Sequence, residues 1–240
     1  MSLTETVLLY STLAAATSAL GAVPAALVPR LPRAVLGWAN AIAAGLMLGA
    51  AHVLAVEGVA RSPVLGALGA ALGAGFVWTA HAVSGHPAGD VPTSREGSLV
   101  RASLHSAAEG VAIGAALLVS APLGLFVAAA IAAHNVPEAM ALTESLRKSG
   151  VRWRESSMLA VLANASQVVL SIATVLLAAR SELSLAVALG VVAGAHVYLV
   201  LVDLLPESYE QAGHETIAVV TSVALGGIVL IEATLRAAGR

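Results

Sequence analysis

The sequence contains no cysteine. This absence excludes disulfides, thiolate metal sites and cysteine nucleophiles, so any metal chemistry must use imidazole, carboxylate, amide or thioether ligands. Aromatic residues are also rare, at 3% of the 240 residues, which leaves little material for aromatic belts at a membrane interface. Charged residues make up only 11% of the chain, and no basic patch is present that would bind nucleic acid.

Apolar residues dominate instead. They make up 58% of the chain, and the mean hydropathy of +0.90 is far from that of a soluble domain. The apolar runs are about 20 residues long, which predicts an all-α integral membrane protein and excludes an outer-membrane barrel. Eight spans are predicted, at Glu5 to Val28, Ala34 to Val59, Pro63 to Val83, Ser98 to Val119, Leu123 to Leu146, Glu155 to Ala179, Leu183 to Leu205 and Thr216 to Ala237.

Residues 1–240 are expected to form one transmembrane domain. The longest connection, residues 84–97, contains Gly, Pro, Asp and Ser without periodicity and is predicted to be a loop. Eight of the 12 Lys and Arg residues fall on the side of this loop, which predicts a cytoplasmic loop and both termini outside. Because Glu5 stands where a signal peptide would be basic, the first apolar run is interpreted as a retained helix.

Two stretches near the middle of the chain each place a histidine and a glutamate four residues apart. His105 and Glu109 lie on the fourth predicted span, and His134 and Glu138 lie on the fifth. On a helix this spacing puts both side chains on one face, and an ionisable group at membrane depth is energetically costly. The two spans are joined by a few residues, so they are expected to be antiparallel neighbours whose pairs share a divalent cation.

The charge of these residues predicts how many ions they hold. Two ionised carboxylates are neutralised by one divalent cation, whereas a second cation would leave uncompensated charge in a low dielectric. Without the ion the carboxylates repel each other, so one is expected to take up a proton that metal binding would release. The competing interpretation is that each pair is only hydrogen-bonded. Two pairs on adjacent spans, with Asn135 and Pro137 beside the second, favour the metal site.

These motifs resemble those of the ZIP family of divalent-metal transporters, especially its bacterial branch. The stretch His134 to Ala139 is close to the family's HNxPEG motif, and His105 to Gly110 is a looser version of it. The likeness extends to Ala43 to Met47 in the second span, and to Ala193–Gly194 and Leu204 to Glu207 in the seventh. The resemblance implies a ZIP-like bundle in which spans 1–3 and 6–8 form an inverted repeat around spans 4 and 5.

The resemblance also implies a set of site residues. The primary site would use Met47, His105, Glu109 and Glu138. A neighbouring second ion would need carboxylates, but the chain has Ser106, Asn135 and the neutral Gln167 at the matching positions, so one ion is expected. The candidate metal-site residues are therefore Met47, His105, Glu109, His134, Asn135, Glu138 and Gln167. Two further candidates are Ser106 and His196, the latter matching Met47 in the repeat alignment.

The resemblance implies that the protein is a carrier of the inner membrane and not an enzyme. Such a carrier would move a divalent metal into the cytoplasm by an elevator-like, alternating-access motion. Zinc is the expected cargo, while cadmium, iron, manganese and cobalt suit the same ligands. No prosthetic group is expected. The lipid bilayer is the expected environment, and a homodimer is possible. Glycine pairs such as Gly69 with Gly73 allow close helix packing, and glycine-rich interfaces would suit the motion.

Two alternatives stay open at this point. An intramembrane metal-dependent hydrolase would need an open zinc position and a general base, commonly as HExxH, and that motif is absent. A metal-sensing membrane protein would bind the ion without transporting it. Other polar residues receive structural interpretations: His52, Asn164 and Ser166 as packing residues, and His81, His86, Asp90, Asp203, Glu207, Glu210 and His214 as solvated surface rather than part of an ion pathway.

Overall fold

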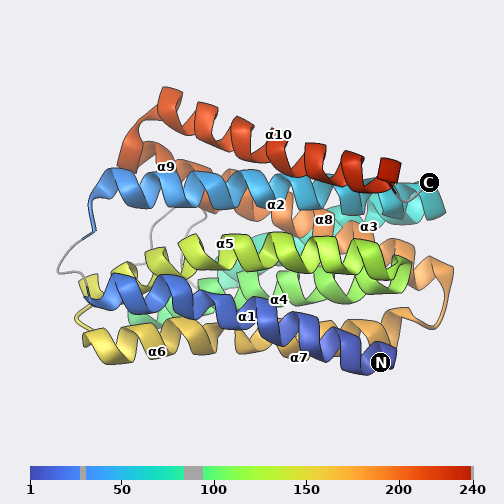
Figure 1. Cartoon of the computed structure of the whole chain (residues 1–240), viewed down its shortest axis with the longest axis horizontal. Helices are drawn as coiled ribbons and strands as arrows, with labels where there is room; N and C mark the ends of the chain where they lie inside the picture. Colours follow the sequence, from blue (N-terminus) through green and yellow to red (C-terminus); the bar gives the residue numbers. More distant parts are fainter. Residues whose placement is uncertain (28–30, 84–93, 239–240) are drawn as a thin grey trace.

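The computed structural model describes residues 1–27, 31–83 and 94–238, which form helices joined by short turns, with no strand among them. Eight helical segments are long and apolar enough to cross a membrane, which confirms the predicted all-α architecture. The elements are α1 (Leu3–Leu27), α2 (Arg33–Arg61), α3 (Pro63–Val83), α4 (Arg95–Val119), α5 (Ala121–Lys148), α6 (Trp153–Ala163), α7 (Ala165–Ala178), α8 (Glu182–Leu199), η1 (Val200–Leu204), α9 (Leu205–Ala212) and α10 (His214–Ala238) (Figure 1).

The predicted loop over residues 84–97 is too long at its carboxyl end. Helix α4 begins at Arg95 rather than Ser98, because Ser94 caps it: the Ser94 hydroxyl accepts a hydrogen bond of 3.0 Å from the Gly97 backbone N–H. The positions of His86 and Asp90 lie outside the described residues. The side of the membrane on which this loop lies stays a prediction.

The sixth predicted span is not one continuous helix. It is interrupted at Asn164, between α6 and α7. The Asn164 side-chain amide donates to the Ala160 carbonyl at 3.1 Å, and its own N–H bonds to Val161 rather than continuing the regular ladder. A short polar side chain that competes for backbone carbonyls explains the break, which an apolar sequence pattern does not reveal.

The seventh span is longer than predicted. Helix α8 passes through a π-helical turn, η1, into α9 and ends only at Gly213, whose φ is +81°. Pro206 therefore does not end the span, because it lies in the first turn of α9, where its missing N–H is tolerated. The connection predicted between Leu205 and Thr216 is thus helical up to Ala212.

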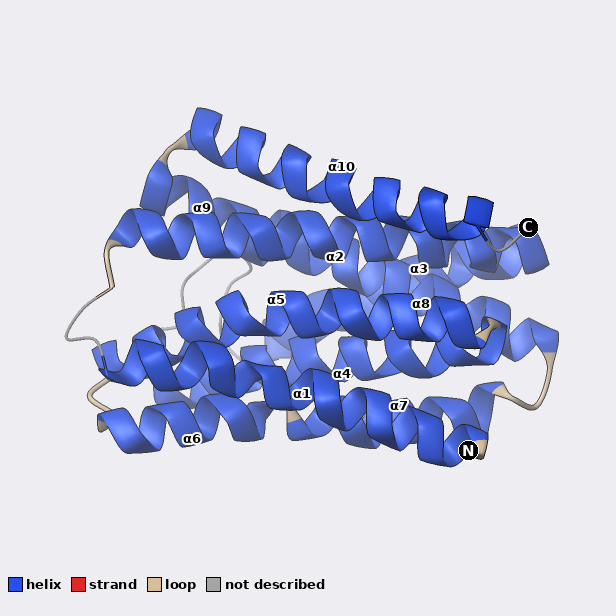
Figure 2. Ribbon diagram, in the orientation of Figure 1, coloured by secondary structure: helices blue, strands red, loops and turns tan. Residues whose placement is uncertain are grey.

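The helices form two groups that lie side by side (Figures 1 and 2). In the first group, α1 packs on α5 and α6, and α4 packs on α5 and α7. In the second group, α2 packs on α8, α9 and α10, and α3 packs on α8. The groups meet where α2 contacts α5 and where α4 contacts α8. The predicted inverted repeat relates α2 to α8, α3 to α10, α1 to α6 and α7, and α4 to α5. The contacts agree with this correspondence: α2 packs on α10 as α8 packs on α3, and α1 packs on α5 as α7 packs on α4.

Glycines bring helices of the same group into close contact. A Cβ at Gly110 would overlap the backbone of Gln167 on α7, and one at Gly73 would overlap Val191 on α8. Similar seams join α1 to α5 at Gly21 and α2 to α10 at Gly45 and Gly49. These close glycine contacts therefore lie within each group, and the expectation that glycine-rich interfaces suit an elevator-like motion stays a prediction.

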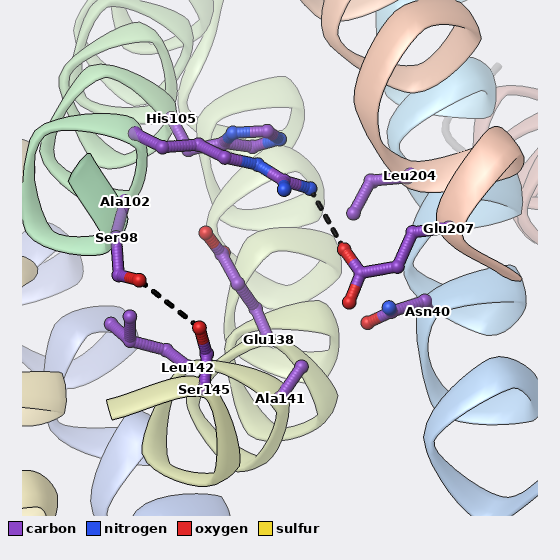
Figure 3. Close-up of a pocket in the computed structure, with 11 residues that line it drawn as sticks. Asn40, Ser98, Ala102, His105, Glu138, Ala141, Leu142, Ser145, Leu204 and Glu207 are labelled. Atoms are coloured by element: carbon purple, nitrogen blue, oxygen red, sulfur yellow. Dashed lines mark hydrogen bonds and ion pairs between the residues drawn. The ribbon is translucent and has the colours of Figure 1, made fainter. Parts of the chain in front are cut away.

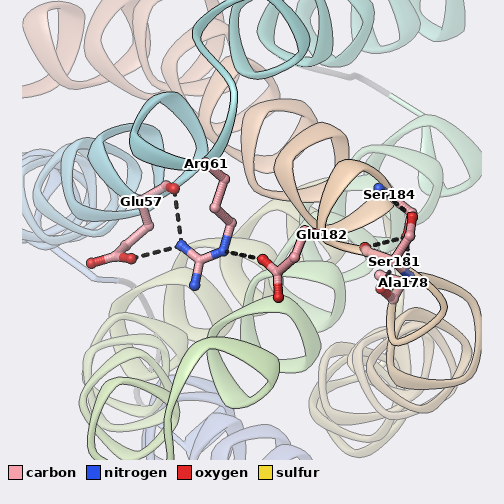
Figure 4. A network of polar contacts seen from close by, with 6 residues as sticks. All are labelled: Glu57, Arg61, Ala178, Ser181, Glu182 and Ser184. Carbon is pink, nitrogen blue, oxygen red and sulfur yellow. Dashed lines mark hydrogen bonds and ion pairs between the residues drawn. The ribbon is translucent and has the colours of Figure 1, made fainter.

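At one end of the second group, ionic contacts join α2 to α8. The Arg61 guanidinium lies 2.8 Å from Glu57 on its own helix and 3.2 Å from Glu182 at the start of α8 (Figure 4). Ser181 and Ser184 form a capping box at the same place, and Ser184 also donates to the Ala178 carbonyl at the end of α7. The start of α8 is thus fixed in position at this end of the bundle.

Candidate metal site

A cluster of three ionisable side chains lies where α4 and α5 pack together. Ligand atoms of Glu109, His134 and Glu138 all lie within 4.8 Å of one another. Glu109 has 0% of its surface exposed and His134 2%, while Glu138 is half-buried. His134 Nε2 donates a hydrogen bond of 2.7 Å to Glu109 Oε1. The three groups supply one imidazole and two carboxylates, which is a donor set that suits zinc and several other divalent transition metals.

The sharp turn at Ser120 explains why these residues meet. Ser120 ends α4 and caps α5, and its hydroxyl accepts from the Leu123 N–H at 3.2 Å. Glu109 lies about three helical turns before Ser120 and His134 about four turns after it, so both lie at a similar depth. The hydrogen bond between Glu109 and His134 joins α4 to α5. Glu109 therefore bonds across the two helices and not to His105 on its own helix.

His105 lies outside the three-residue cluster but close to Glu138. Both line one cavity at the boundary of the two helix groups (Figure 3). His105 is 2% exposed, and its Nε2 has no hydrogen-bond partner. A buried ring nitrogen without a partner costs about 1–3 kcal/mol, so a ligand in this cavity would relieve that cost.

Met47 and His196 come from the second group. Each is 1% exposed. Met47 lies in an apolar cluster with Ala195 and Leu199, against which Ala108 of α4 also packs. Neither ring nitrogen of His196 has a hydrogen-bond partner. Both residues are buried in the second group, whose helix α8 contacts α4, and His196 does not belong to the cluster of Glu109, His134 and Glu138.

The residues predicted around a second ion form a hydrogen-bonded network instead. Asn135 donates to the Ala14 carbonyl at 2.8 Å and to Gln167 Oε1 at 3.1 Å, and Gln167 donates to the Ser11 carbonyl at 3.1 Å. This network ties α1, α5 and α7 together with neutral groups. Ser106 lies apart from it and bonds to Asn164 at 3.4 Å.

A family model described as the ZIP zinc transporter matches residues 99–232. The chain belongs to the ZIP zinc transporter family. The chain is also 27% identical over 238 residues to an Arabidopsis thaliana protein that is provisionally named a zinc transporter, a match that covers 93% of this chain and 38% of that protein. The chain thus spans about two fifths of the length of the curated relative it matches.

The region that matches the ZIP family contains α4 except for its first turn, all of α5 and every candidate ligand except Met47. Several polar residues in and around it differ from their predicted environment. His81 and Asp203, expected at a solvated surface, are 6% and 4% exposed and lie 3.4 Å apart. His52, expected to be a packing residue, is exposed on α2. Ser166 is a packing residue as expected, since it donates to the Ser103 carbonyl at 3.0 Å.

Sequence reasoning missed two residues of this ZIP chain that line the cavity. Arg101 lies one helical turn before His105, and Asn40 of α2 is 1% exposed with no hydrogen-bond partner for either side-chain atom. The spacing of Arg101 and His105, four residues apart, could have pointed to Arg101. Asn40 gave no signal, because its approach to the site depends on how α2 packs against α5.

Proposed function

We propose that this chain carries a divalent transition metal across a membrane, with zinc as the expected cargo. The observation that carries the proposal is the meeting of Glu109, His134 and Glu138 between two membrane-spanning helices. Two carboxylates at membrane depth are costly unless a cation neutralises them, and one divalent ion matches their charge. Membership of the ZIP family supports the same function.

The cargo would be held mainly by the first helix group. Glu109, His134 and Glu138 would supply the ligands, and His105, whose Nε2 has no hydrogen-bond partner, lines the same cavity as Glu138. Met47 and His196 belong to the second group, so they would contact the ion only in some positions of the two groups. Asn135 and Gln167 would support the site by fixing α5 against α1 and α7.

An elevator-like motion would slide the first group along the second. The glycine seams within each group support this proposal, because backbones in such close contact move as one body. The boundary between the groups contains the cavity with Glu138, so a shift along it would change the side from which the ion is reached.

The orientation follows the distribution of Lys and Arg. Both termini would lie outside the inner membrane, and transport would run toward the cytoplasmic side, where α4 begins. Exposed apolar side chains on α3 and α10 would face lipid or, in a homodimer, a second copy of the chain. The whole chain would then form one transporter domain without a prosthetic group.

Metal flux into proteoliposomes tests the proposal. The purified chain should take up zinc saturably, and a panel of other divalent ions, with and without a pH gradient, would rank its cargo and detect proton coupling. Glu138→Gln should abolish this flux, whereas Glu144→Gln should retain it, because Glu144 is a buried glutamate of the same helix outside the cluster. Zinc binding without flux would support the sensor interpretation instead.

A further inference from the structure

Arg101 joins the two helix groups. It lies on α4 of the first group, and its side chain is 16% exposed. Its Nη2 donates to Glu207 Oε2 of α9 at 3.1 Å, the contact drawn in Figure 3 as the dashed line that ends at Glu207. Its Nε lies 3.6 Å from Asp203 Oδ2 of η1. One guanidinium of the first group thus contacts two carboxylates of the second.

The two carboxylates are held in place by their own group. His81 of α3 lies 3.4 Å from Asp203 Oδ2, and Gln211 donates to Glu207 Oε1 at 3.0 Å. Asp203 and Glu207 are spaced four residues apart along a helical segment, so they face the same way. The second group therefore holds two carboxylates in fixed positions. Among the described side chains of the first group, only Arg101 forms an ion pair with them.

Other ion pairs between described side chains lie within one group. Arg95, on the same helix as Arg101, pairs with Glu155 of α6 at 3.0 Å, and Arg61 pairs with residues of α2 and α8. The Arg101 contacts differ because they cross the boundary. Any sliding of α4 along α8 must break them, whereas the Arg95 and Arg61 pairs would move as part of their groups.

Arg101 also lines the cavity of the site. That cavity contains His105 and Glu138 from the first group and Asn40 and Glu207 from the second. We propose that Arg101 is an ionic latch: it holds the groups in the register in which Glu138 faces this cavity, and each transport cycle must open it. The latch rests on the proposed function, because it presupposes that the two groups move.

The Arg101 contacts are largely shielded from solvent, because the side chains of Arg101 and Glu207 are each 16% exposed and that of Asp203 is 3% exposed. Salt therefore screens these charges less than it screens a surface pair. Removing one partner is expected to change the equilibrium between the two registers by about fivefold or more. A change of that size is enough to favour one register over the other.

Thiol labelling measures the register directly, because the chain has no cysteine of its own. Ala141 lines the cavity, so Ala141→Cys introduces a single thiol that a polar maleimide can reach in this register. In lipid nanodiscs without metal, adding Arg101→Gln should slow labelling by about fivefold or more. Glu207→Gln should slow it less, because the contact of Arg101 with Asp203 remains. The double variant should be no slower than Arg101→Gln alone, and Arg101→Lys should restore part of the rate.

Arg95→Gln is the matched control. It removes an arginine and an ion pair from the same helix but within one group, so labelling should be unchanged. Equal labelling rates for Arg101→Gln, Glu207→Gln and Arg95→Gln, in samples that elute as folded protein, would overturn the latch. Zinc flux is measured separately: flux without a labelling change rejects only the latch, and a labelling change without flux rejects only the transport function.

Discussion

At the scale of single residues, several of the buried polar atoms that lack hydrogen-bond partners lie at or beside the site. Glu109 Oε2, His105 Nε2 and Asn135 Oδ1 are buried without a hydrogen bond, and so are both ring nitrogens of His196. Each such atom costs about 1–3 kcal/mol, and ionised groups cost more. The chain therefore gives up stability at the place where a cation would bind, as expected of a functional site.

Removing one carboxylate should separate stability from binding. We expect Glu109→Gln to keep or raise the unfolding temperature without metal, because the Gln amide can still hydrogen-bond to His134 Nε2 while the repulsion between the two carboxylates is removed. Zinc should stabilise the wild-type chain by about 2.7 kcal/mol at a free concentration of about 100 Kd, and the variant should lose most of this effect. Thermal unfolding in detergent with and without zinc measures both, and an undiminished zinc effect in the variant would remove Glu109 from the site.

The neutral network beside the site predicts the binding stoichiometry. Asn135 and Gln167 bring no charge, so two carboxylates must balance all the bound metal. Purified protein should bind one zinc ion per chain at this site, as measured by elemental analysis after gel filtration. Glu138→Gln should reduce that number toward zero. Two tightly bound ions that both disappear in Glu138→Gln would contradict the charge argument.

At the scale of elements, the pair α4 and α5 creates the site, and glycine seams fix its position. Gly110 lies directly after Glu109 and lets α4 approach the backbone of α7. A side chain there would push α4 away from α7 and shift the Glu109 carboxylate. The helix packing that supports the site therefore depends on a residue with no side chain.

Substitution of this glycine should harm the fold and the site together. Gly110→Ala is expected to lower the free energy of unfolding by about 1–3 kcal/mol and to reduce zinc flux, because the new Cβ meets the Gln167 backbone. Gly226→Ala on α10 is the matched control, since nothing lies within 4 Å of its Cβ position. That control should leave flux intact and change stability by less than about 1 kcal/mol. Equal unfolding temperatures for the two variants would show that the α4–α7 seam tolerates the added methyl.

At the scale of the whole molecule, two groups of helices share one boundary. Apolar contacts, the cavity and the Arg101 contacts all lie on this boundary, while the close glycine contacts lie inside the groups. Backbones are in close contact within each group, whereas the interface between the two groups is made mainly of side chains. A shift along such an interface leaves the backbone seams of each group unchanged.

The orientation of the molecule can be tested by surface labelling. Ser2→Cys should react with a membrane-impermeant maleimide in intact cells, because the N-terminus is predicted to lie outside. Arg152→Cys, in the connection between α5 and α6, should react only after the membrane is opened. Both residues are exposed, so access to solvent does not distinguish them. The reverse pattern would place the termini in the cytoplasm and reverse the predicted direction of transport.

The sequence by itself determined the number of spans and which helices carry the ionisable residues. Long apolar runs can only be satisfied as membrane helices, and a spacing of four residues puts His134 and Glu138 on one helix face wherever that helix packs. The limits of the sixth and seventh spans were less predictable. They depend on side-chain bonds at Asn164 and on the π-helical turn before Pro206, which local hydropathy does not record.

Only the tertiary structure decided which residues meet. The partner of Glu109 is His134 rather than His105, Asn135 bonds to Gln167, and Arg101 reaches Asp203 and Glu207 in the other helix group. These contacts join residues between 25 and 106 positions apart in the chain. A helix pattern fixes the direction of a side chain around its own axis, but the rotation and depth of each neighbouring helix come from how glycine and alanine surfaces fit together.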